Sequence, residues 1–285
     1  MSERPDAALD SMIAKIAAEL GLVRPQFVAL EGGAANRSFR LLDARHDFVL
    51  RFQGGTALAL GASGALERAV QALAAAAGLA PAIVYSDPSQ GILVTQHVAG
   101  RVPGLSEFRR SGMLRRAGAW IARLHAHASP PGLAAIDFGA RAAGYLARLD
   151  SCAPGPYATG LGEKLAGRRA ALPPCARLAP CHHDLHHRNF VDTGDALLVV
   201  DWEYAGPGDP AADLAACIGY HDLDAAGVDA LLAGYGRDSP VLRARIAALG
   251  WIFDCLWFGW NACAAAAGLQ IDIELQSRLA ARLAG

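Results

Sequence analysis

A short, histidine-rich stretch in the second half of the chain holds the residues best suited to chemistry. Asp184 is followed five residues later by Asn189, and Asp201 lies twelve residues beyond that. Gly194-Asp195 between them has the form of a two-residue hairpin turn, which would place Asn189 opposite Val200 and therefore next to Asp201. Two oxygen-bearing side chains at the open end of one hairpin could share a magnesium ion, because Mg²⁺ prefers oxygen ligands.

Phosphoryl transfer needs an arrangement of this kind. In such reactions Mg²⁺ bridges the phosphates, while a nearby carboxylate orients the incoming hydroxyl group and accepts its proton. Asp184 lies beside the expected metal residues Asn189 and Asp201 without being forced onto the metal. The spacing therefore indicates a kinase-type transfer to an alcohol, with ATP and Mg²⁺ as cofactors.

The histidines of the same stretch permit two other interpretations. His182 and His186 have the i,i+4 spacing of zinc ligands on a helix, as have His183 and His187, and Cys181 precedes them. A zinc site of this type needs a helix here, and the glutamate of the HExxH motif is missing. Alternatively, the histidines orient the loop through hydrogen bonds to backbone carbonyls. For His182 we favour this structural role.

The elements that must position these residues differ between the two parts of the chain. Before residue 99, short apolar segments alternate with turns, which predicts a leading amphipathic helix, five antiparallel strands and one inserted helix at about 64–77. Beyond residue 104 helical periodicity dominates, and only 190–202 is strand-like. The strands are expected at 27–30, 38–42, 48–52, 82–85 and 91–98, and the later helices at 105–127, 140–150, 160–171, 211–219, 224–235, 239–267 and 272–284.

This pattern predicts an α+β fold of two lobes. Residues 1–98 would form the smaller, nucleotide-binding lobe, and residues 99–285 the larger, mainly helical lobe that carries catalysis and binds the acceptor. The active site is expected at the junction of the two lobes.

Two segments of the larger lobe resemble a known family. CHHDLHHRNF (181–190) and LLVVDWEYAGPGDPAADLA (197–215) are similar to the catalytic region of the aminoglycoside phosphotransferase/choline kinase superfamily, which has a protein-kinase-like fold. The resemblance extends from about residue 28 to 260 and favours the choline/ethanolamine and bacterial thiamine kinase branches, which carry similar D-[WF]-E-Y segments. Aminoglycoside-modifying members usually lack the WEY segment.

The resemblance implies roles for individual residues. It implies that Asp184 is the catalytic base and that Asn189 and Asp201 bind Mg²⁺. It also implies that Asp213, in the segment GDPAADLA, braces the lobe.

The resemblance further implies a nucleotide site in the smaller lobe, where a cationic strand residue grips the phosphates and pairs with a helix glutamate. Arg51 is the candidate cation, because neither lysine of the chain lies in the expected sheet, and Glu67 resembles its partner. The alternatives are a solvated strand charge and an ordinary exposed helix acid. With the turn over the phosphates and the adenine hinge, the expected site comprises Gly33, Asn36, Arg51, Glu67, Gln96, His97 and Val98.

The acceptor site is expected on the long helix near the end of the chain. Trp251, Asp254 and Trp257 share one helix face, and a carboxylate among aromatic rings is costly to bury unpaired. A cationic alcohol such as choline, ethanolamine or thiamine would neutralise the carboxylate and make cation–π contacts. Trp202 and Tyr204 are further candidates for the pocket wall. The alternative is that the rings are core residues and that Asp254 pairs with an arginine.

Composition excludes several other classes of protein. With 53% hydrophobic residues and a net charge of −1, the chain is neither disordered nor a binder of nucleic acid through a basic surface. The start of the chain lacks the apolar core of a secretory signal, and Asp254 and Asn261 interrupt the most apolar stretch, 247–269, which predicts a buried helix and no membrane association. Six cysteines without a CxxC pair indicate reduced thiols in a cytoplasmic protein.

The sequence thus predicts a kinase whose partner is a small-molecule alcohol, and it leaves the oligomeric state open. Three other functions compete with this one. They are an aminoglycoside or sugar O-phosphotransferase, a catalytically silent ligand-binding member of the same fold, and a zinc-dependent hydrolase.

Overall fold

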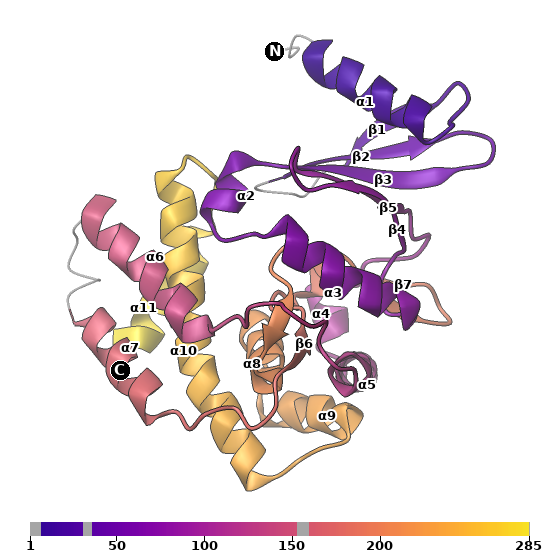
Figure 1. Cartoon of the computed structure of the whole chain (residues 1–285). Coiled ribbons are helices and arrows are strands. Elements are labelled where there is room, and N and C mark those ends of the chain that lie inside the picture. The colour runs from indigo at the N-terminus through magenta and orange to yellow at the C-terminus, as the bar shows by residue number, and fades with distance from the viewer. Residues whose placement is uncertain (1–6, 31–35, 153–159, 285) are drawn as a thin grey trace.

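The computed structural model describes residues 7–30, 36–152 and 160–284. At one end of the molecule a sheet of five antiparallel strands has the order β1-β2-β3-β5-β4, as Figure 1 shows. The five-stranded antiparallel sheet expected from the sequence is therefore confirmed. Its strands are β1 (Gln26–Leu30), β2 (Asn36–Leu42), β3 (Asp47–Gln53), β4 (Ile83–Asp87) and β5 (Ile92–Gln96).

Three helices accompany the sheet: α1 (Ala7–Glu19), α2 (Gly55–Ala59) and α3 (Gly64–Ala76). The prediction of a single helix inserted between strands is wrong, because the chain forms both α2 and α3 between β3 and β4. Gly61 has a φ of +93° between these two helices, which a continuing right-handed helix cannot accommodate. Ser63 then caps the N-terminus of α3 and accepts a hydrogen bond from the N–H of Leu66.

The rest of the chain is mainly helical. The segment 105–127, expected as one helix, forms two helices that are separated at Arg109 and Arg110. The helices are α4 (Leu105–Phe108), α5 (Ser111–Ala126), α6 (Phe138–Cys152), α7 (Leu161–Ala171), α8 (Pro210–His221), α9 (Ala225–Tyr235), α10 (Pro240–Ala266) and α11 (Ile273–Ala284).

Glycines allow α5 and α9 to pack with their backbones close together. A Cβ atom on Gly118 of α5 would lie 2.1 Å from the carbonyl oxygen of Leu231, and one on Gly234 of α9 would lie 2.1 Å from that of Arg115. Any side chain at either position would force the two helices apart.

The apolar interior is divided into two cores. The smaller core lies between α1 and the sheet and includes Ile16, Leu41 and Leu50. The larger core fills the helical part and also takes in Val70 of α3 and Leu79. In Figure 1, α3 accordingly lies between the sheet and the helices. The proposed division into lobes 1–98 and 99–285 stays a prediction.

The apolar stretch 247–269 lies largely in α10, which packs against α6, α8 and α11. None of the helices in the described ranges has the length and apolar character needed to cross a bilayer.

Two pairs of short strands in the helical part flank the loop that carries Asp184. The strand β6 (Ala179–Cys181) pairs with β9 (Gly206–Gly208), and β7 (Phe190–Asp192) pairs with β8 (Leu197–Val199). The second pair is the hairpin expected from Gly194-Asp195. Its register aligns Phe190 with Val199, and the N–H of Val200 donates to the carbonyl oxygen of Asn189 at 2.9 Å. The expected register is confirmed.

Candidate active site

The loop 182–189 joins β6 to the hairpin and is held by Asp213 from the first turn of α8. The backbone N–H groups of His182 and His183 donate to the two carboxylate oxygens of Asp213 at 2.9 and 2.7 Å. His183 has a φ of 65°, in the left-handed region, which turns the chain sharply just before Asp184. The buried carboxylate therefore fixes the backbone that carries Asp184.

Asp213 is fully buried and has a third hydrogen-bond donor. Nε2 of His125 lies 3.1 Å from the Oδ2 atom of Asp213, and Nδ1 of the same ring lies 3.2 Å from the hydroxyl oxygen of Tyr235. Burial alone would raise the pKa of Asp213, but the hydrogen bond from His125 and the neighbouring N–H groups outweigh burial and lower the pKa to about 2. Asp213 thus stays ionised and braces the loop.

The loop brings Asp184 and Asn189 into contact. Nδ2 of Asn189 donates to the carbonyl oxygen of Asp184 at 2.8 Å and to its Oδ2 atom at 3.2 Å. Because these bonds use the amide nitrogen, the amide oxygen is the atom of Asn189 that can bind a cation. The hydroxyl group of Tyr220 donates to Oδ1 of Asp184 at 2.6 Å.

Asp201 follows the hairpin and connects to the sheet. Its φ of 63° is left-handed, and its Oδ1 atom accepts a hydrogen bond from Nη1 of Arg51 at 2.7 Å. The other terminal nitrogen of Arg51, on β3, pairs with Glu67 of α3. Arg51 is 9% exposed and Glu67 3%, so neither is the solvated surface charge of the alternative interpretation. The expected arginine–glutamate pair forms and reaches Asp201.

Glu203 and Asn36 extend this group of side chains. Oε2 of Glu203 accepts a hydrogen bond from Nδ2 of Asn36 at 2.7 Å, and Oδ1 of Asn36 accepts one from the N–H of Gly54 at 3.2 Å. Burial and, second, the charge of Asp201 raise the pKa of Glu203 to about 8. Burial likewise raises the pKa of Glu67.

Three carboxylates therefore share the single positive charge of Arg51. When all three are ionised, they exceed that charge by two, which a divalent cation would balance. The oxygen donors of Asn189, Asp201 and Glu203 are the type that Mg²⁺ prefers. The chemistry of these donors therefore suits a magnesium ion.

The sequence-based reasoning missed two members of the site. Glu203 is the glutamate of the quoted DWEY segment, so a signal was present in the resemblance. Tyr220 lies 36 residues from Asp184 and carries no local signal of its role.

The zinc interpretation of the histidines is wrong. The 3₁₀ turn His187–Asn189 replaces the helix that would align the i,i+4 pairs. Nε2 of His182 lies 3.1 Å from the carbonyl oxygen of Val200, and Nδ1 of His183 lies 3.2 Å from that of Tyr204, as expected for residues that orient the loop. Burial lowers the pKa of both rings, that of His183 to about 4, so both are neutral at pH 7.

The expected adenine hinge lies at the end of β5. The N–H of Gln96 donates to the carbonyl oxygen of Ala82 and that of His97 to Asp47, each at 2.9 Å. An adenine contact made through a backbone N–H at this hinge would therefore be made by Val98. Gly33, expected in the turn over the phosphates, lies outside the described residues.

One side of α10 lies close to the loop. The ring of Trp257 packs edge-on against Tyr220, with 4.7 Å between the ring centroids. Nε1 of Trp260 donates to the hydroxyl oxygen of Tyr204 at 3.0 Å. Trp257 and Tyr204, both expected in the acceptor site, therefore lie near the loop. Trp257 contacts Tyr220, which binds Asp184, and Tyr204 contacts His183.

Two expected acceptor residues are corrected by the structure. Trp202 is completely buried against Trp120, and its Nε1 donates to the carbonyl oxygen of Val199 at 2.9 Å, so it is a core residue and no pocket wall. Asp254 accepts a hydrogen bond from Nη2 of Arg282 at 2.7 Å. The pairing with an arginine, which was the alternative, is confirmed, although burial outweighs Arg282 and raises the pKa of Asp254 to about 6.

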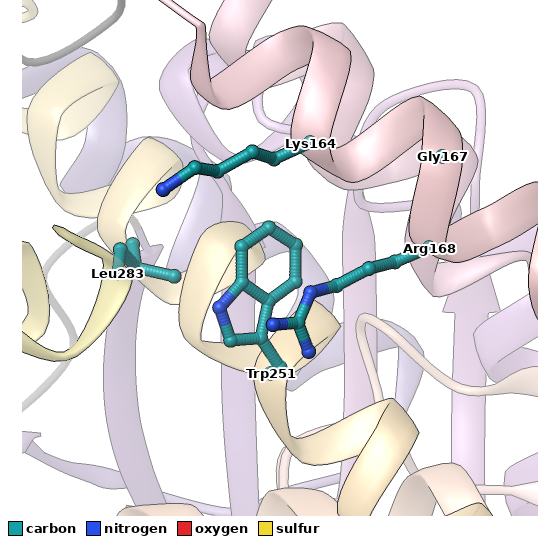
Figure 2. A pocket seen from close by; sticks show the side chains of 5 residues that line it. All are labelled: Lys164, Gly167, Arg168, Trp251 and Leu283. Carbon is teal, nitrogen blue, oxygen red and sulfur yellow. The ribbon is translucent and has the colours of Figure 1, made fainter. Parts of the chain in front are cut away.

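A separate pocket of about 330 Å³ lies between α7, α10 and α11 (Figure 2). The guanidinium group of Arg168 covers the indole ring of Trp251 there, 4.2 Å from the ring centroid. Trp251 therefore faces α7 and does not share the site with Trp257. The pocket is lined by Lys164, Gly167, Arg168, Trp251 and Leu283.

Comparison with solved structures supports the expected fold. A choline/ethanolamine kinase family protein from Mesorhizobium loti is 27% identical, with a TM-score of 0.77 over 95% of this chain and 93% of that one. The choline kinase LicA from Streptococcus pneumoniae is 18% identical, with a TM-score of 0.80 over 97% and 99% of the two chains, and so shares the fold. The predicted two-part α+β fold with its antiparallel sheet is thus confirmed.

Sequence comparison shows the family. A thiamine kinase from Escherichia coli is 49% identical over 49 residues, a match that covers 17% of this chain and only 18% of that kinase. The model of the phosphotransferase enzyme family matches residues 26–249, which is most of the chain. The resemblance seen in the sequence is therefore confirmed, and the chain belongs to the phosphotransferase enzyme family.

Proposed function

We propose that this phosphotransferase moves the γ-phosphoryl group of ATP to the hydroxyl group of a small cationic or amino alcohol, such as choline, ethanolamine or thiamine. One observation carries the proposal. The hairpin of β7 and β8 begins directly after the loop with Asp184 and Asn189 and ends just before Asp201. Asp201 is ion-paired with Arg51 of the sheet, which is paired in turn with Glu67 of α3.

Each residue then has a role in positioning or charge neutralisation. Arg51, fixed by Glu67, binds phosphate oxygens, for which its forked guanidinium is suited. Asn189 and Asp201, with Glu203, would hold Mg²⁺, which when bound neutralises phosphate charge. Asp184 orients the acceptor hydroxyl group and takes its proton. Catalysis by such a site depends mainly on orientation and electrostatic stabilisation.

The substrate class rests on the aromatic rings next to Asp184. The ring of Tyr220 packs edge to face against Trp257 and Phe253 of α10, and Trp260 of the same helix donates to the hydroxyl oxygen of Tyr204. Aromatic faces attract cationic ammonium and thiazolium groups. Relatives named as choline, ethanolamine and thiamine kinases support the same class.

The remaining nucleotide contacts belong to the same proposal. We assign Gly33 and Asn36 to the loop over the phosphates, and Gln96, His97 and Val98 to the adenine hinge. In this assignment residues 1–98 supply the nucleotide contacts and residues 99–285 supply the acceptor contacts.

A coupled assay of ADP formation with a panel of alcohols tests the proposal. The panel contains choline, ethanolamine, thiamine, an aminoglycoside and a neutral sugar. Turnover with a cationic small alcohol is expected for the wild type, and Asp184→Asn should lower kcat by about 10²- to 10⁴-fold. Asp238→Asn, at an exposed aspartate paired with Arg243, is the matched control.

Each alternative has its own outcome. Preference for the aminoglycoside or the sugar would indicate that the chain is an aminoglycoside or sugar O-phosphotransferase. A thermal shift with ATP but no turnover on any alcohol would indicate a silent binding protein. Undiminished turnover in Asp184→Asn would overturn the assignment of the catalytic residue.

A further inference from the structure

We propose that Tyr220 is a positioning residue that holds the side-chain carboxylate of Asp184 in the orientation required for phosphoryl transfer. The inference rests on the proposed function, because it assigns Asp184 to the acceptor hydroxyl group. It rests on the geometry of α8 and of the loop 182–189.

The carboxylate of Asp184 needs an external partner to keep one orientation. The terminal torsion of an aspartate side chain has a broad, roughly two-fold profile, so the backbone alone does not fix it. The hydroxyl group of Tyr220 donates to Oδ1 at 2.6 Å, while Asn189 Nδ2 lies 3.2 Å and His186 Nε2 lies 3.6 Å from Oδ2. The bond from Tyr220 is therefore the shortest contact of this carboxylate with a side chain in the described structure.

Tyr220 is itself held in place on three sides. Its ring packs edge-on against His186, Phe253 and Trp257, with centroid distances of 5.5, 4.9 and 4.7 Å. Burial raises the pKa of the Tyr220 hydroxyl well above its ordinary value, so the group remains a donor at neutral pH. A rigid, protonated phenol is a suitable device for fixing a carboxylate.

The same helix thus controls both the backbone and the side chain of the loop. Asp213 and Tyr220 are seven residues apart in α8, which is two helical turns, and they therefore share a face. Asp213 binds the N–H groups of His182 and His183, and Tyr220 binds the side chain of Asp184. Tyr220 therefore does more than pack between α8 and α10, because it also orients the side chain of Asp184.

Tyr220→Phe tests the role, because it keeps the ring and removes only the hydroxyl group. We expect kcat to fall 10- to 100-fold, while KM for ATP and for the alcohol changes less than twofold. Tyr85→Phe, at a partly buried tyrosine packed on the small core beside the sheet, is the matched control and should leave both constants unchanged. An unchanged kcat in Tyr220→Phe, or a loss seen only in KM, would overturn the proposal.

A double-mutant cycle gives a readout that does not depend on activity. Urea denaturation should show that Tyr220→Phe lowers the free energy of unfolding in the wild-type background but does not lower it in the Asp184→Ala background. If the losses of unfolding free energy in the two single variants added up to the loss in the double variant, the hydroxyl group would not act through Asp184, and the proposal would be overturned. A wild type that phosphorylates no alcohol would defeat the proposed function, whereas the cycle would still report whether Tyr220 holds Asp184.

Discussion

Two groups of charged side chains at the segment 182–203 have carboxylates whose pKa values are shifted in opposite directions. We call Asp213, His125 and the N–H groups bound to Asp213 the brace cluster. The carboxylates of Glu67, Asp201 and Glu203 around Arg51 form the acidic cluster. The pKa of Asp213 is lowered to about 2, whereas the pKa of Glu203 is raised to about 8.

The number of donors explains the difference. One carboxylate in the brace cluster has three donors, so its negative charge is compensated within the protein. In the acidic cluster, three carboxylates compete for one guanidinium group. The donors of the brace cluster therefore compensate its charge within the protein, while the acidic cluster keeps an excess negative charge that a bound cation would offset. A buried carboxylate indicates a functional site when the donors and cations of the protein around it do not balance its negative charge.

The largest effect is expected when the acidic cluster loses Asp201. Asp201→Asn should lower kcat/KM at least 10³-fold, equivalent to about 4 kcal/mol, because a proposed metal ligand and the partner of Arg51 are lost. Removal of one of three competing carboxylates should not destabilise the fold. Turnover and thermal unfolding of the same preparation check both statements. If Asp201→Asn instead lowered the thermal stability and left the turnover of the folded protein unchanged, the acidic cluster would have a structural role like that of the brace cluster, and the contrast between them would be wrong.

The opposite pattern is expected in the brace cluster. Asp213→Ala should lower the free energy of unfolding by about 3 kcal/mol, because the N–H groups of His182 and His183 lose their acceptors in a buried place. Activity should fall as a consequence of the displaced loop. Urea denaturation measures the stability, and a cost below about 1 kcal/mol would show that the brace is dispensable.

A change of pH should affect the two clusters in opposite directions. Folding lowers the pKa of Asp213 from 3.8 to about 2, so its stabilisation is present above pH 4 and is lost as the pH falls toward 2, by about 2 kcal/mol. Folding raises the pKa of Glu203 from 4.5 to about 8, so the folded state keeps a proton that the unfolded chain has lost, and stability falls as the pH rises between these values.

Denaturation of the wild type and of Glu203→Gln from pH 3 to 9 resolves these slopes. Glu203→Gln keeps an acceptor for Asn36 but cannot ionise, so it should become more stable than the wild type as the pH rises toward 8. Parallel curves for the two proteins would contradict the raised pKa of Glu203.

The smallest effect is expected outside both clusters, at Asp254. Because Asp254 pairs with the partly exposed Arg282 and burial raises its pKa to about 6, Asp254→Asn should change stability by less than about 1 kcal/mol and KM for the alcohol less than twofold. Steady-state kinetics with the best alcohol of the panel measure this. A tenfold rise in KM would return Asp254 to the acceptor site.

Sequence alone determined the features that depend on neighbouring residues. Alternating apolar residues and turns located the five strands, and Gly194-Asp195 set a hairpin register that brought Asn189 level with Val200. The short helix α2 and the helix break at Arg109-Arg110 were not predicted, because a helix of five residues or a short interruption hardly alters the apolar periodicity. The pairing of Arg51 with Glu67 came only from the resemblance, since no spacing rule joins a strand to the next helix.

Tertiary structure decided every partner that comes from a distant element. The contacts of Tyr220 with Asp184, Asn36 with Glu203 and Arg282 with Asp254 join residues 36, 167 and 28 positions apart. Packing also decided that Trp202 is core while Trp257 lies near the loop. Periodicity reports which face of an element is apolar, but the partner of a buried charge depends on how whole elements dock, and that is settled by the packing of the entire chain.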